Sequence, residues 1–324
     1  MNKDLVTIEN LLPEIGQDEV QKEILSGLTS RQKRISSKYF YDEKGSMLFE
    51  EISKLEEYYP TRTEIAILKL NASLLTHDFR GKTIIELGSG NCAKISHLFD
   101  VISEDDLHTI TYVPVDVSIS AVNASIRSLS KQFPGLNLNG IAADFFYQLN
   151  LLPKSSSKII CFFGSTVGNL SNQETRQFLK DTTDQMFPGD QFLLGLDMVK
   201  KKSMLEKAYN DSKQVTAAFN KNILCVVNKL VETDFNPDDF EHIAFFNESE
   251  SRIEMHLKAK TDLVIQSHLL DNKIRFASGE TIHTENSYKF TPDQITDLAA
   301  SVRLTISNIY TDPDNLFSLV QLKK

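Results

Sequence analysis

The segment that most constrains the fold is residues 83–94, where a short aliphatic run ends at two glycines separated by one residue. The run Thr83–Leu87 predicts a buried strand, and residues 93 to about 101 predict a helix after the turn. Gly88 and Gly90 have no Cβ, so the backbone there can adopt positive φ and approach a ligand. The free N–H groups of the helix N-terminus would face the same ligand. The segment therefore predicts a strand–turn–helix ligand loop, although an empty turn explains an isolated glycine pair equally well.

From residue 82 onward, strand-like apolar segments alternate with helical patterns, which is typical of a parallel sheet covered on both faces. The expected strands are residues 83–87, 109–117, 139–143, 158–164 and 191–198. After a helix that starts near Pro292, residues 304–310 and 315–322 are expected to form a closing hairpin. The expected fold class is α/β: a Rossmann-like, doubly wound sheet with a closing antiparallel hairpin.

Two regions fall outside this alternation, residues 1–60 and residues 199–288. The first is expected to be helical over about 1–30 and 46–55, and Pro60 is expected to hold Tyr59 in an extended joint. Thr61 and Glu64 form a capping-box pattern for the next helix. The second region predicts one long helix, about 203–220, followed by two hairpins between 242 and 276.

These patterns predict two structural parts. We expect residues 61–198 and 289–324 to form the sheet domain. We expect residues 1–60 and 199–288 to combine into a second, α+β lobe that binds substrate.

The acidic residues around the sheet discriminate between two nucleotide-binding interpretations. The spacing Gly88-x-Gly90-x-x-Ala93 fits the relaxed dinucleotide fingerprint of dehydrogenases. Glu86 before the first glycine, Asp116 at the end of the second strand, and Asp144-Phe145 after the third instead resemble the motif series of class I S-adenosylmethionine-dependent methyltransferases. In that arrangement Asp116 holds the ribose hydroxyls, as the acidic residue after the second strand does in doubly wound sheets, and Asp144-Phe145 borders the adenine.

Composition excludes several other classes of function. The formal net charge of −9 and the lack of a basic patch with interleaved aromatics argue against a nucleic-acid partner. Three scattered cysteines and seven dispersed histidines predict no metal site. No apolar run approaches the length of a membrane span and the N-terminus lacks a signal-peptide pattern, so we expect a cytoplasmic protein with no membrane partner.

Six blocks carry a closer resemblance, residues 40–42, 57–64, 86–90, 164–170, 215–220 and 252–255. In these blocks, and from about residue 30 to the C-terminus, the sequence resembles the L-histidine Nα-methyltransferases of ergothioneine biosynthesis. The resemblance implies S-adenosylmethionine as co-substrate and three methyl transfers that convert L-histidine, through its mono- and dimethyl forms, into hercynine. We expect a monomer that acts on this small molecule.

The resemblance also implies two sets of site residues. The cofactor set is Tyr41, Gly88, Lys94, Asp116, Asp144 and Phe145. The histidine-binding set is Tyr58, Asn169, Tyr209, Met255, Glu285 and Ser287. Asn169 and Tyr209 would hold the carboxylate end of the substrate, Glu285 and Ser287 would contact the imidazole, and Met255 would shape that pocket.

Three details complete the site hypothesis. Tyr41 would position the methyl group or relay a proton. Cys92 departs from the family motif, because many methyltransferases have a third glycine there. Without the resemblance, Tyr58 would be assigned to a packed helix corner, Asn169 to a turn, and Glu285 to a polar surface loop.

Two alternatives to histidine trimethylation stay open from the sequence. One is Nα-methylation of another aromatic amino acid such as tryptophan, and the other is a non-catalytic S-adenosylmethionine-binding protein. Glu285 favours histidine, because a buried acid without a partner is costly and an apolar side chain would supply none.

Overall fold

The computed structural model describes residues 6–12, 16–155, 157–267, 269 and 273–324. The chain divides into two compact units. The first unit comprises Met1–Pro13, Arg62–Val199 and Phe290–Lys324, and the second comprises Glu14–Thr61 and Lys200–Lys289. This division differs from the one expected from the sequence at the N-terminus, because the first strand of the chain belongs to the first unit.

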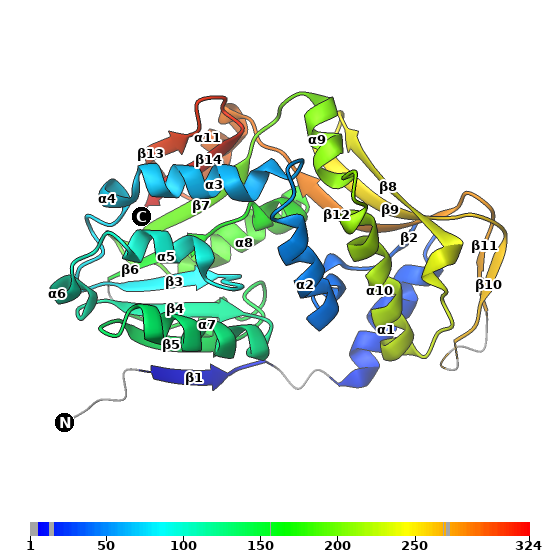
Figure 1. Ribbon diagram of the computed structural model, residues 1–324, viewed down its shortest axis with the longest axis horizontal. Coiled ribbons are helices and arrows are strands. Elements are labelled where there is room, and N and C mark those ends of the chain that lie inside the picture. The colour runs from blue at the N-terminus through cyan, green and yellow to red at the C-terminus, as the bar shows by residue number, and fades with distance from the viewer. Residues whose placement is uncertain (1–5, 13–15, 156, 268, 270–272) are drawn as a thin grey trace. The chain divides into compact units, whose positions relative to one another are not determined.

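The first unit is built on one eight-stranded sheet (Figure 1). In spatial order its strands are β1 (Val6–Asn10), β5 (Asn137–Ala142), β4 (Thr111–Asp116), β3 (Thr83–Leu87), β6 (Lys158–Phe162), β7 (Gln191–Asp197), β14 (Phe317–Lys323) and β13 (Thr305–Thr311). The strands from β1 to β7 are parallel, and β14 and β13 form the antiparallel closing hairpin. The chain order reverses between β3 and β6, so the Rossmann-like, doubly wound fold is confirmed.

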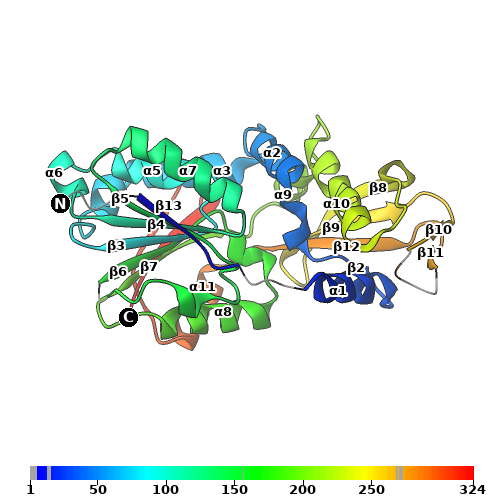
Figure 2. The same cartoon turned by 90° about the horizontal axis from the view of Figure 1, so that it is seen from below.

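Helices cover both faces of this sheet (Figure 2). On one face lie α3 (Tyr59–Leu70), α5 (Ala93–Phe99) and α7 (Ile119–Gln132), and on the other lie α8 (Asn172–Asp184) and α11 (Pro292–Ser301). The central strands are apolar on both sides, as Ile84, Ile85 and Phe162 show with no exposed surface. A strand buried on both faces cannot show the polar–apolar alternation of a half-exposed strand. Two short helices, α4 (Ala72–Leu75) and α6 (Glu104–Leu107), complete the connections.

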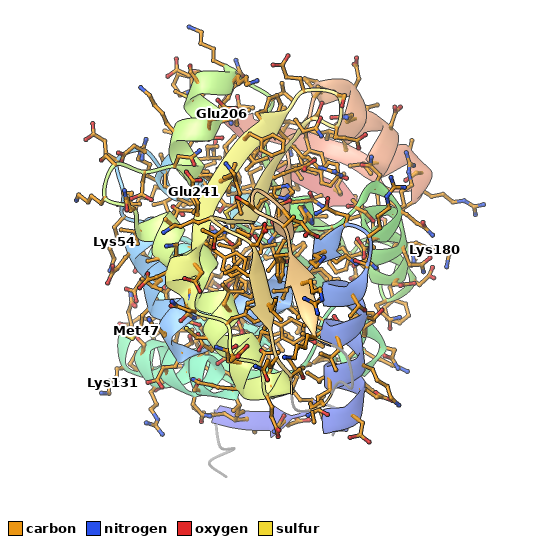
Figure 3. All side chains as sticks on the ribbon, turned by 90° about the vertical axis from the view of Figure 1, so that its right-hand side faces the viewer. Met47, Lys54, Lys131, Lys180, Glu206 and Glu241 are labelled. Carbon is orange, nitrogen blue, oxygen red and sulfur yellow. The ribbon has the colours of Figure 1, made fainter. Side chains whose placement is uncertain are left out.

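The second unit has a four-stranded sheet and a small hairpin. The sheet order is β2 (Lys33–Arg34), β12 (Thr281–Tyr288), β9 (Arg252–Ala259) and β8 (Phe240–Asn247), and the hairpin is β10 (Leu263–Ile265) with β11 (Ile274–Phe276). Its helices are α1 (Gln17–Thr29), α2 (Glu43–Ile52), α9 (Lys202–Tyr209) and α10 (Val215–Val231). Polar or flexible side chains, such as those of Lys54 and Glu241, project outward from this unit (Figure 3).

Several expected elements are wrong in detail. Residues 6–10 form β1 rather than a helix, because they pair in parallel register with β5 and complete the edge of the sheet. Helix α3 begins at Tyr59, so the extended joint expected before Pro60 is absent; proline is tolerated in a first helical turn, where the N–H has no helical partner. Strand β12 was not expected as a strand at all.

The long helix expected over 203–220 is two helices, α9 and α10. The break between them depends on Asp211, whose two carboxylate oxygens accept the backbone N–H groups of Val215 and Thr216 at 2.9 and 2.8 Å. Gln214 takes φ 58° to let the chain turn into α10. The break ends α9 at Tyr209, one of the expected substrate residues. No helix among the described residues is both long and apolar enough to cross a bilayer.

We predict that Asp211→Ala lowers the free energy of unfolding by about 1–2 kcal/mol, because the first turn of α10 loses both capping bonds. Urea denaturation followed by circular dichroism would measure the change. Glu241→Ala is the matched control, because that exposed carboxylate forms a surface ion pair with half-buried Lys258 and its loss should cost little stability. Equal stability of the Asp211 variant and wild type would contradict the role given to Asp211.

Candidate active site

The glycine turn after β3 has the backbone geometry of a ligand loop. Gly88 and Gly90 have φ of 66° and 52°, and the next residue with positive φ is Cys92 at 55°. Cys92 stands where many methyltransferases have a third glycine, and its left-handed backbone shows why glycine suits that position. A Cβ added at Gly90 would meet nothing within 4 Å, so the loop is open there. Ser89 carries a buried hydroxyl with no hydrogen-bond partner among the described residues.

Asp116 ends β4 directly beside this loop. Its Oδ2 accepts the N–H of Gly90 at 3.0 Å, and its Oδ1 accepts the N–H of Ser118 at 2.9 Å. Burial raises the pKa of Asp116, while these backbone donors oppose that effect. Each carboxylate oxygen keeps a lone pair, so the group can still accept hydrogen bonds from the two hydroxyls of a ribose.

Phe145 and Asp144 follow β5 at the same edge of the sheet. A Cβ added at Gly88 would lie 3.4 Å from Cζ of Phe145, so the ring borders the loop. The ring is nearly buried and packs edge-on against Phe162, with 5.6 Å between centroids. Asp144 accepts the N–H of Phe146 at 3.1 Å, which fixes the turn. A planar apolar wall therefore flanks the loop, as an adenine ring requires.

Lys94, the remaining expected cofactor residue of this unit, is held by a carboxylate that the sequence did not reveal as a site residue. Its ammonium lies 2.7 Å from Oε2 of Glu64, which is fully buried. Both Glu64 oxygens also accept the N–H of Gly164 at 2.9 Å. Glu64 was expected to cap α3, but it instead ties α3 to the turns after β3 and β6. A Cβ at Gly195 would lie 2.2 Å from Glu64, so only glycine fits there.

Asn169 lies in the same turn region, in the short 3-10 helix Thr166–Asn169 after β6. The carboxyl ends of β3, β4, β5 and β6 thus carry the expected residues of the first unit on one edge of the sheet. This edge, at a reversal of strand order, is where doubly wound sheets bind ligands.

A buried polar network lies beneath the glycine loop. The phenol of Tyr112 donates to the carboxylate of Glu86 and lies 3.3 Å from the thiol of Cys92. Burial raises the pKa of Glu86 to about 8, despite the hydrogen bond from Tyr112. Glu86 is therefore largely protonated at neutral pH and supports the loop without a buried charge.

Five of the six expected histidine-binding residues lie in the second unit and form one cluster. Met255 on β9 is the cross-strand partner of Glu285 on β12, and Ser287 follows two residues later on the same face. Tyr209, at the end of α9, donates to Ser287 Oγ at 2.8 Å. The ring of Tyr58 packs edge-on against that of Tyr209, with 6.1 Å between centroids. The sixth residue, Asn169, belongs to the first unit.

Glu285 is the most unusual member of this cluster. Its side chain is about nine-tenths buried, yet it accepts no hydrogen bond from any residue that the structure describes. Burial raises its pKa to about 7, against the opposing charge of Lys289. A buried carboxylate in this condition is arranged to receive a donor from a ligand.

Lys289 is a site residue that the sequence analysis missed. It is almost fully buried, and its ammonium lies 2.8 Å from Ser287 Oγ and 3.1 Å from the Tyr209 hydroxyl. Its position two residues after Ser287 was the available signal, because it continues the face that carries Glu285 and Ser287.

Tyr41 belongs to the second unit, whereas the other expected cofactor residues belong to the first. Its ring packs edge-on with Phe49 and Phe219 at 5.8 and 5.9 Å between centroids, and it remains 36% exposed. This exposure leaves part of the ring available to a ligand, and its expected role in cofactor binding stays a prediction.

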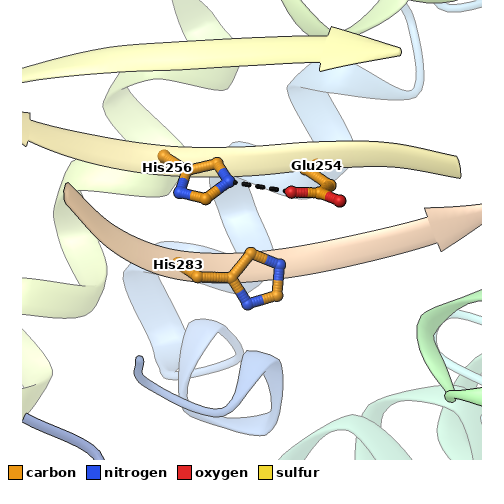
Figure 4. Close-up of side chains that lie close together, drawn as sticks. All are labelled: Glu254, His256 and His283. Atoms are coloured by element: carbon orange, nitrogen blue, oxygen red, sulfur yellow. Dashed lines mark hydrogen bonds and ion pairs between the residues drawn. The ribbon is translucent and has the colours of Figure 1, made fainter. Parts of the chain in front are cut away.

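The opposite face of the second-unit sheet brings together Glu254, His256 and His283, a grouping not expected from the dispersed histidines (Figure 4). One possible ligand atom from each lies within 4.8 Å of the others. Arg252 already pairs with Glu254 at 2.8 Å, and His283 is hydrogen-bonded to Asn286 at 2.9 Å. Burial raises the pKa of Glu254, but hydrogen bonds from its neighbours outweigh that and lower it to about 2. These contacts join the group into a polar network, in which Nδ1 of His256 has no hydrogen-bond partner among the described residues. The expectation of no metal stays a prediction.

Fold and site together define a class I S-adenosylmethionine-dependent methyltransferase, with an eight-stranded doubly wound sheet, an open glycine loop, and an acid at the end of β4. The profile of a family described as "Histidine-specific methyltransferase, SAM-dependent" matches residues 20–324. The chain belongs to this family of histidine-specific methyltransferases.

Individual relatives agree with this assignment. The chain is 37% identical over 300 residues to histidine N-alpha-methyltransferase of Mycolicibacterium smegmatis, covering 93% of each chain. It is 36% identical over 315 residues to the protein of the same name from Mycobacterium tuberculosis, covering 97% of this chain and 98% of that one. Ergothioneine biosynthesis protein 1 of Neurospora crassa is 27% identical over 303 residues, which are 90% of this chain and 33% of that protein.

The residues of the first unit fit S-adenosylmethionine. The open backbone at Gly90, the unpartnered hydroxyl of Ser89 and the carboxylate of Asp116 offer polar groups beside the ring of Phe145. When bound, the molecule supplies an electrophilic methyl group on a sulfonium.

We predict that Asp116→Ala weakens S-adenosylmethionine binding by about 1.5–3 kcal/mol, the range for hydrogen bonds to a charged group. Titration calorimetry would measure the affinity. Asp105→Ala is the matched control, because that carboxylate is exposed on α6. Unchanged affinity in a folded Asp116 variant would rule out its assignment to the ribose.

We also predict that Glu86 makes the stability of the protein fall as pH rises. The folded pKa of about 8 exceeds the ordinary value of 4.5, so the folded state binds the extra proton between these two pH values. Stability is therefore greatest below pH 4.5 for this group and is lost as pH rises toward 8. In Glu86→Gln, which keeps an acceptor for Tyr112, the difference in unfolding free energy from wild type should grow in favour of the variant by at least ~1 kcal/mol over this window. A constant difference across this pH range would refute the prediction.

Proposed function

We propose that this protein transfers three methyl groups in succession from S-adenosylmethionine to the α-amino nitrogen of L-histidine and so produces hercynine, the first step of ergothioneine biosynthesis. The observation that carries the proposal is Glu285, a buried carboxylate without a partner among the described residues. Membership of the histidine-specific family and the names of the mycobacterial and Neurospora relatives support it.

The substrate residues have separate tasks in this proposal. Glu285 accepts a ring N–H of the imidazole in a charge-assisted hydrogen bond, and Met255 packs beside it. Asn169 holds the carboxylate end that all amino acids share, and Tyr209, whose hydrogen is donated to Ser287, lines that end of the pocket together with Tyr58.

The chain contributes position rather than a nucleophile. Methyl transfer is an in-line displacement, in which the amine lone pair attacks the methyl carbon and the bond to sulfur breaks. Holding the two reacting groups in line can supply several kcal/mol, up to ~7–11. Each transfer needs a neutral amine with a free lone pair, and the α-amino group is partly protonated at neutral pH. The starting ammonium and the monomethyl- and dimethylammonium products of the first two transfers must therefore each lose a proton before the next methyl group is accepted. Tyr41 is the proposed relay for that proton or the residue that positions the methyl group.

A product with three methyl groups is a permanent cation, and aromatic faces suit it. Tyr41 and Phe145 are the proposed aromatic contacts, each worth roughly 0.5–2 kcal/mol to a cation placed over its ring. Uptake of a second and a third methyl group also requires room around the amine and few hydrogen-bond donors aimed at it.

Incubation of the purified protein with S-adenosylmethionine and each of the twenty amino acids, followed by mass spectrometry, tests the proposal. Histidine should gain one, two and finally three methyl groups, and hercynine should accumulate. Accumulation of monomethylhistidine alone would contradict trimethylation, and methylation of tryptophan in preference to histidine would contradict the substrate assignment. Binding of S-adenosylmethionine with no methylated product would indicate a non-catalytic protein.

We predict that Glu285→Ala lowers kcat/KM for histidine. The corresponding rise in activation free energy should be about 1.5–3 kcal/mol, the contribution of a hydrogen bond to a charged group. The variant also removes the desolvation cost that a larger apolar ring meets at the carboxylate, so kcat/KM for tryptophan should rise. Both effects lower the ratio of kcat/KM for histidine to kcat/KM for tryptophan. Asn169→Ala should instead lower kcat/KM for both substrates by the same factor, because Asn169 is proposed to contact atoms that they share. Glu241→Ala serves as the control. If the ratio holds in Glu285→Ala, another residue selects the substrate.

A further inference from the structure

Lys289 lies against the hydroxyl of Ser287, at the proposed imidazole site, and against the hydroxyl of Tyr209, at the proposed carboxylate end. Its ammonium is within hydrogen-bond distance of Ser287 Oγ at 2.8 Å and of the Tyr209 hydroxyl at 3.1 Å, and it lies 5.0 Å from the centre of the Tyr209 ring. An ammonium has three N–H donors and no acceptor. Both hydroxyl oxygens therefore accept from Lys289, and neither can donate to it.

The third contact in this triangle fixes the remaining hydrogens. The Tyr209 hydroxyl donates to Ser287 Oγ at 2.8 Å. Ser287 Oγ then accepts from both Tyr209 and Lys289, which occupies its two lone pairs. Ser287 donates to no group in the part of the chain that the structure describes. Its own hydrogen is the one polar contact that this hydroxyl can still offer to a ligand.

Glu285 has the complementary property. It lies two residues before Ser287 on the same face of β12, and its buried carboxylate accepts no hydrogen bond from the described residues. The site therefore presents one acceptor, from Glu285, and one committed donor, from Ser287. Among the titratable groups that the structure describes, Lys289 and Tyr209 contact Ser287 directly, and Tyr58 packs against Tyr209.

We propose that Lys289 is a positioning residue that makes Ser287 a hydrogen-bond donor, so that the site selects the neutral imidazole ring of histidine, with one N–H and one bare nitrogen. The N–H donates to Glu285, and the bare nitrogen accepts from Ser287. An imidazolium has two N–H groups, so one of them would point at the Ser287 hydrogen, and its positive charge would be repelled by Lys289. An indole has an N–H but no bare nitrogen, so it would leave Ser287 unsatisfied. This inference rests on the proposed function and adds to it the protonation state of the bound ring and the residue that enforces it.

Nitrogen-15 NMR of ring-labelled histidine tests the proposal, because its chemical shifts distinguish a neutral ring from an imidazolium and report which nitrogen carries the proton. The probe is labelled L-histidine bound to the full-length protein together with S-adenosylhomocysteine, so that no methyl transfer occurs. At pH ~6 the free ring, with a pKa of about 6.5, is mostly protonated. In the wild type we expect the bound ring to show one protonated and one bare nitrogen at this pH.

Lys289→Met is the diagnostic variant, because it keeps an apolar stem of similar length and removes the ammonium. Without the ammonium, Ser287 can accept a hydrogen bond from a second ring N–H. The positive charge of Lys289, which disfavours a second cation beside Glu285, is also removed. The bound ring should then become an imidazolium at pH ~6, with its apparent pKa raised by at least about one unit. Lys289→Arg, which keeps the charge and the donors, should restore the neutral ring. A role limited to packing would leave the protonation state unchanged.

The outcomes separate this inference from the proposed function. A wild-type protein that binds histidine as an imidazolium would overturn the inference and leave histidine methylation intact. Unchanged nitrogen shifts in Lys289→Met would also overturn it. Failure of the wild type to bind histidine would instead defeat the proposed function, and the inference with it. Binding of S-adenosylhomocysteine to the first unit reports whether Lys289→Met folds. If it does not fold, the spectrum of histidine bound to the wild type and the same measurement on Ser287→Ala test the inference. Loss of the hydroxyl should weaken histidine binding about tenfold and raise the apparent pKa of the bound ring.

Discussion

The parallel pairing of β3 with β4 on one side and β6 on the other is the constraint on which the first unit depends. Glu86 pairs with Pro114 and Cys161 in register, so the strands end together and their turns emerge at one edge. Because the chain runs outward in both directions from β3, the two neighbouring turns diverge and leave the glycine loop open. Gly88 and Lys94 follow β3, Asp116 ends β4, and Asp144 and Phe145 follow the neighbouring strand β5. The ligand loop is thus a consequence of strand order, and its particular residues then select the ligand.

Desolvation of carboxylates explains how the polar residues of the site are arranged. Three buried acids meet this cost in three ways. Glu64 is paired with the ammonium of Lys94 and accepts the N–H of Gly164, whereas burial raises the pKa of Glu86 to about 8 and favours its protonated form. Glu285 has neither a hydrogen-bonded cation nor a backbone donor among the described residues, and burial raises its pKa to about 7, so both the ionised and the protonated form are accessible near neutral pH. Glu64 and Glu86 have structural roles because other residues of the protein satisfy their carboxyl oxygens with hydrogen bonds. Glu285 is suited to bind a ligand because its oxygens accept no hydrogen bond from the described residues.

The sequence predicted the first unit better than the second for a physical reason. Strands such as β3 and β6 are buried on both faces and read as continuous apolar runs, so periodicity and the glycine turn were sufficient. In β12 the inward positions are Glu285 and Ser287, and the polar residues that make a binding surface hide the alternation that marks a strand. Glu64 was predicted as a helix cap because its pattern is local, while its partners Lys94 and Gly164 are distant in sequence. Resemblance to a known family named most site residues, but it did not include Lys289, whose role follows only from three-dimensional contacts.

The two polar faces of the second-unit sheet depend on one irregularity in β12. His283 pairs with His256 and Glu285 pairs with Met255, so the ladder shifts register between them and Thr284 is the extra residue. Regular alternation would place Glu285 on the face of His283; the bulge instead places it with Met255. Buried Thr284 donates to Asn220 on α10 at 2.7 Å and is within reach of the Met255 carbonyl at 3.0 Å, which holds the bulge in place. The position of the proposed imidazole acceptor is therefore set by a threonine that contacts no substrate. A helix that packs on the sheet, rather than the strand sequence alone, decides which face becomes the binding surface.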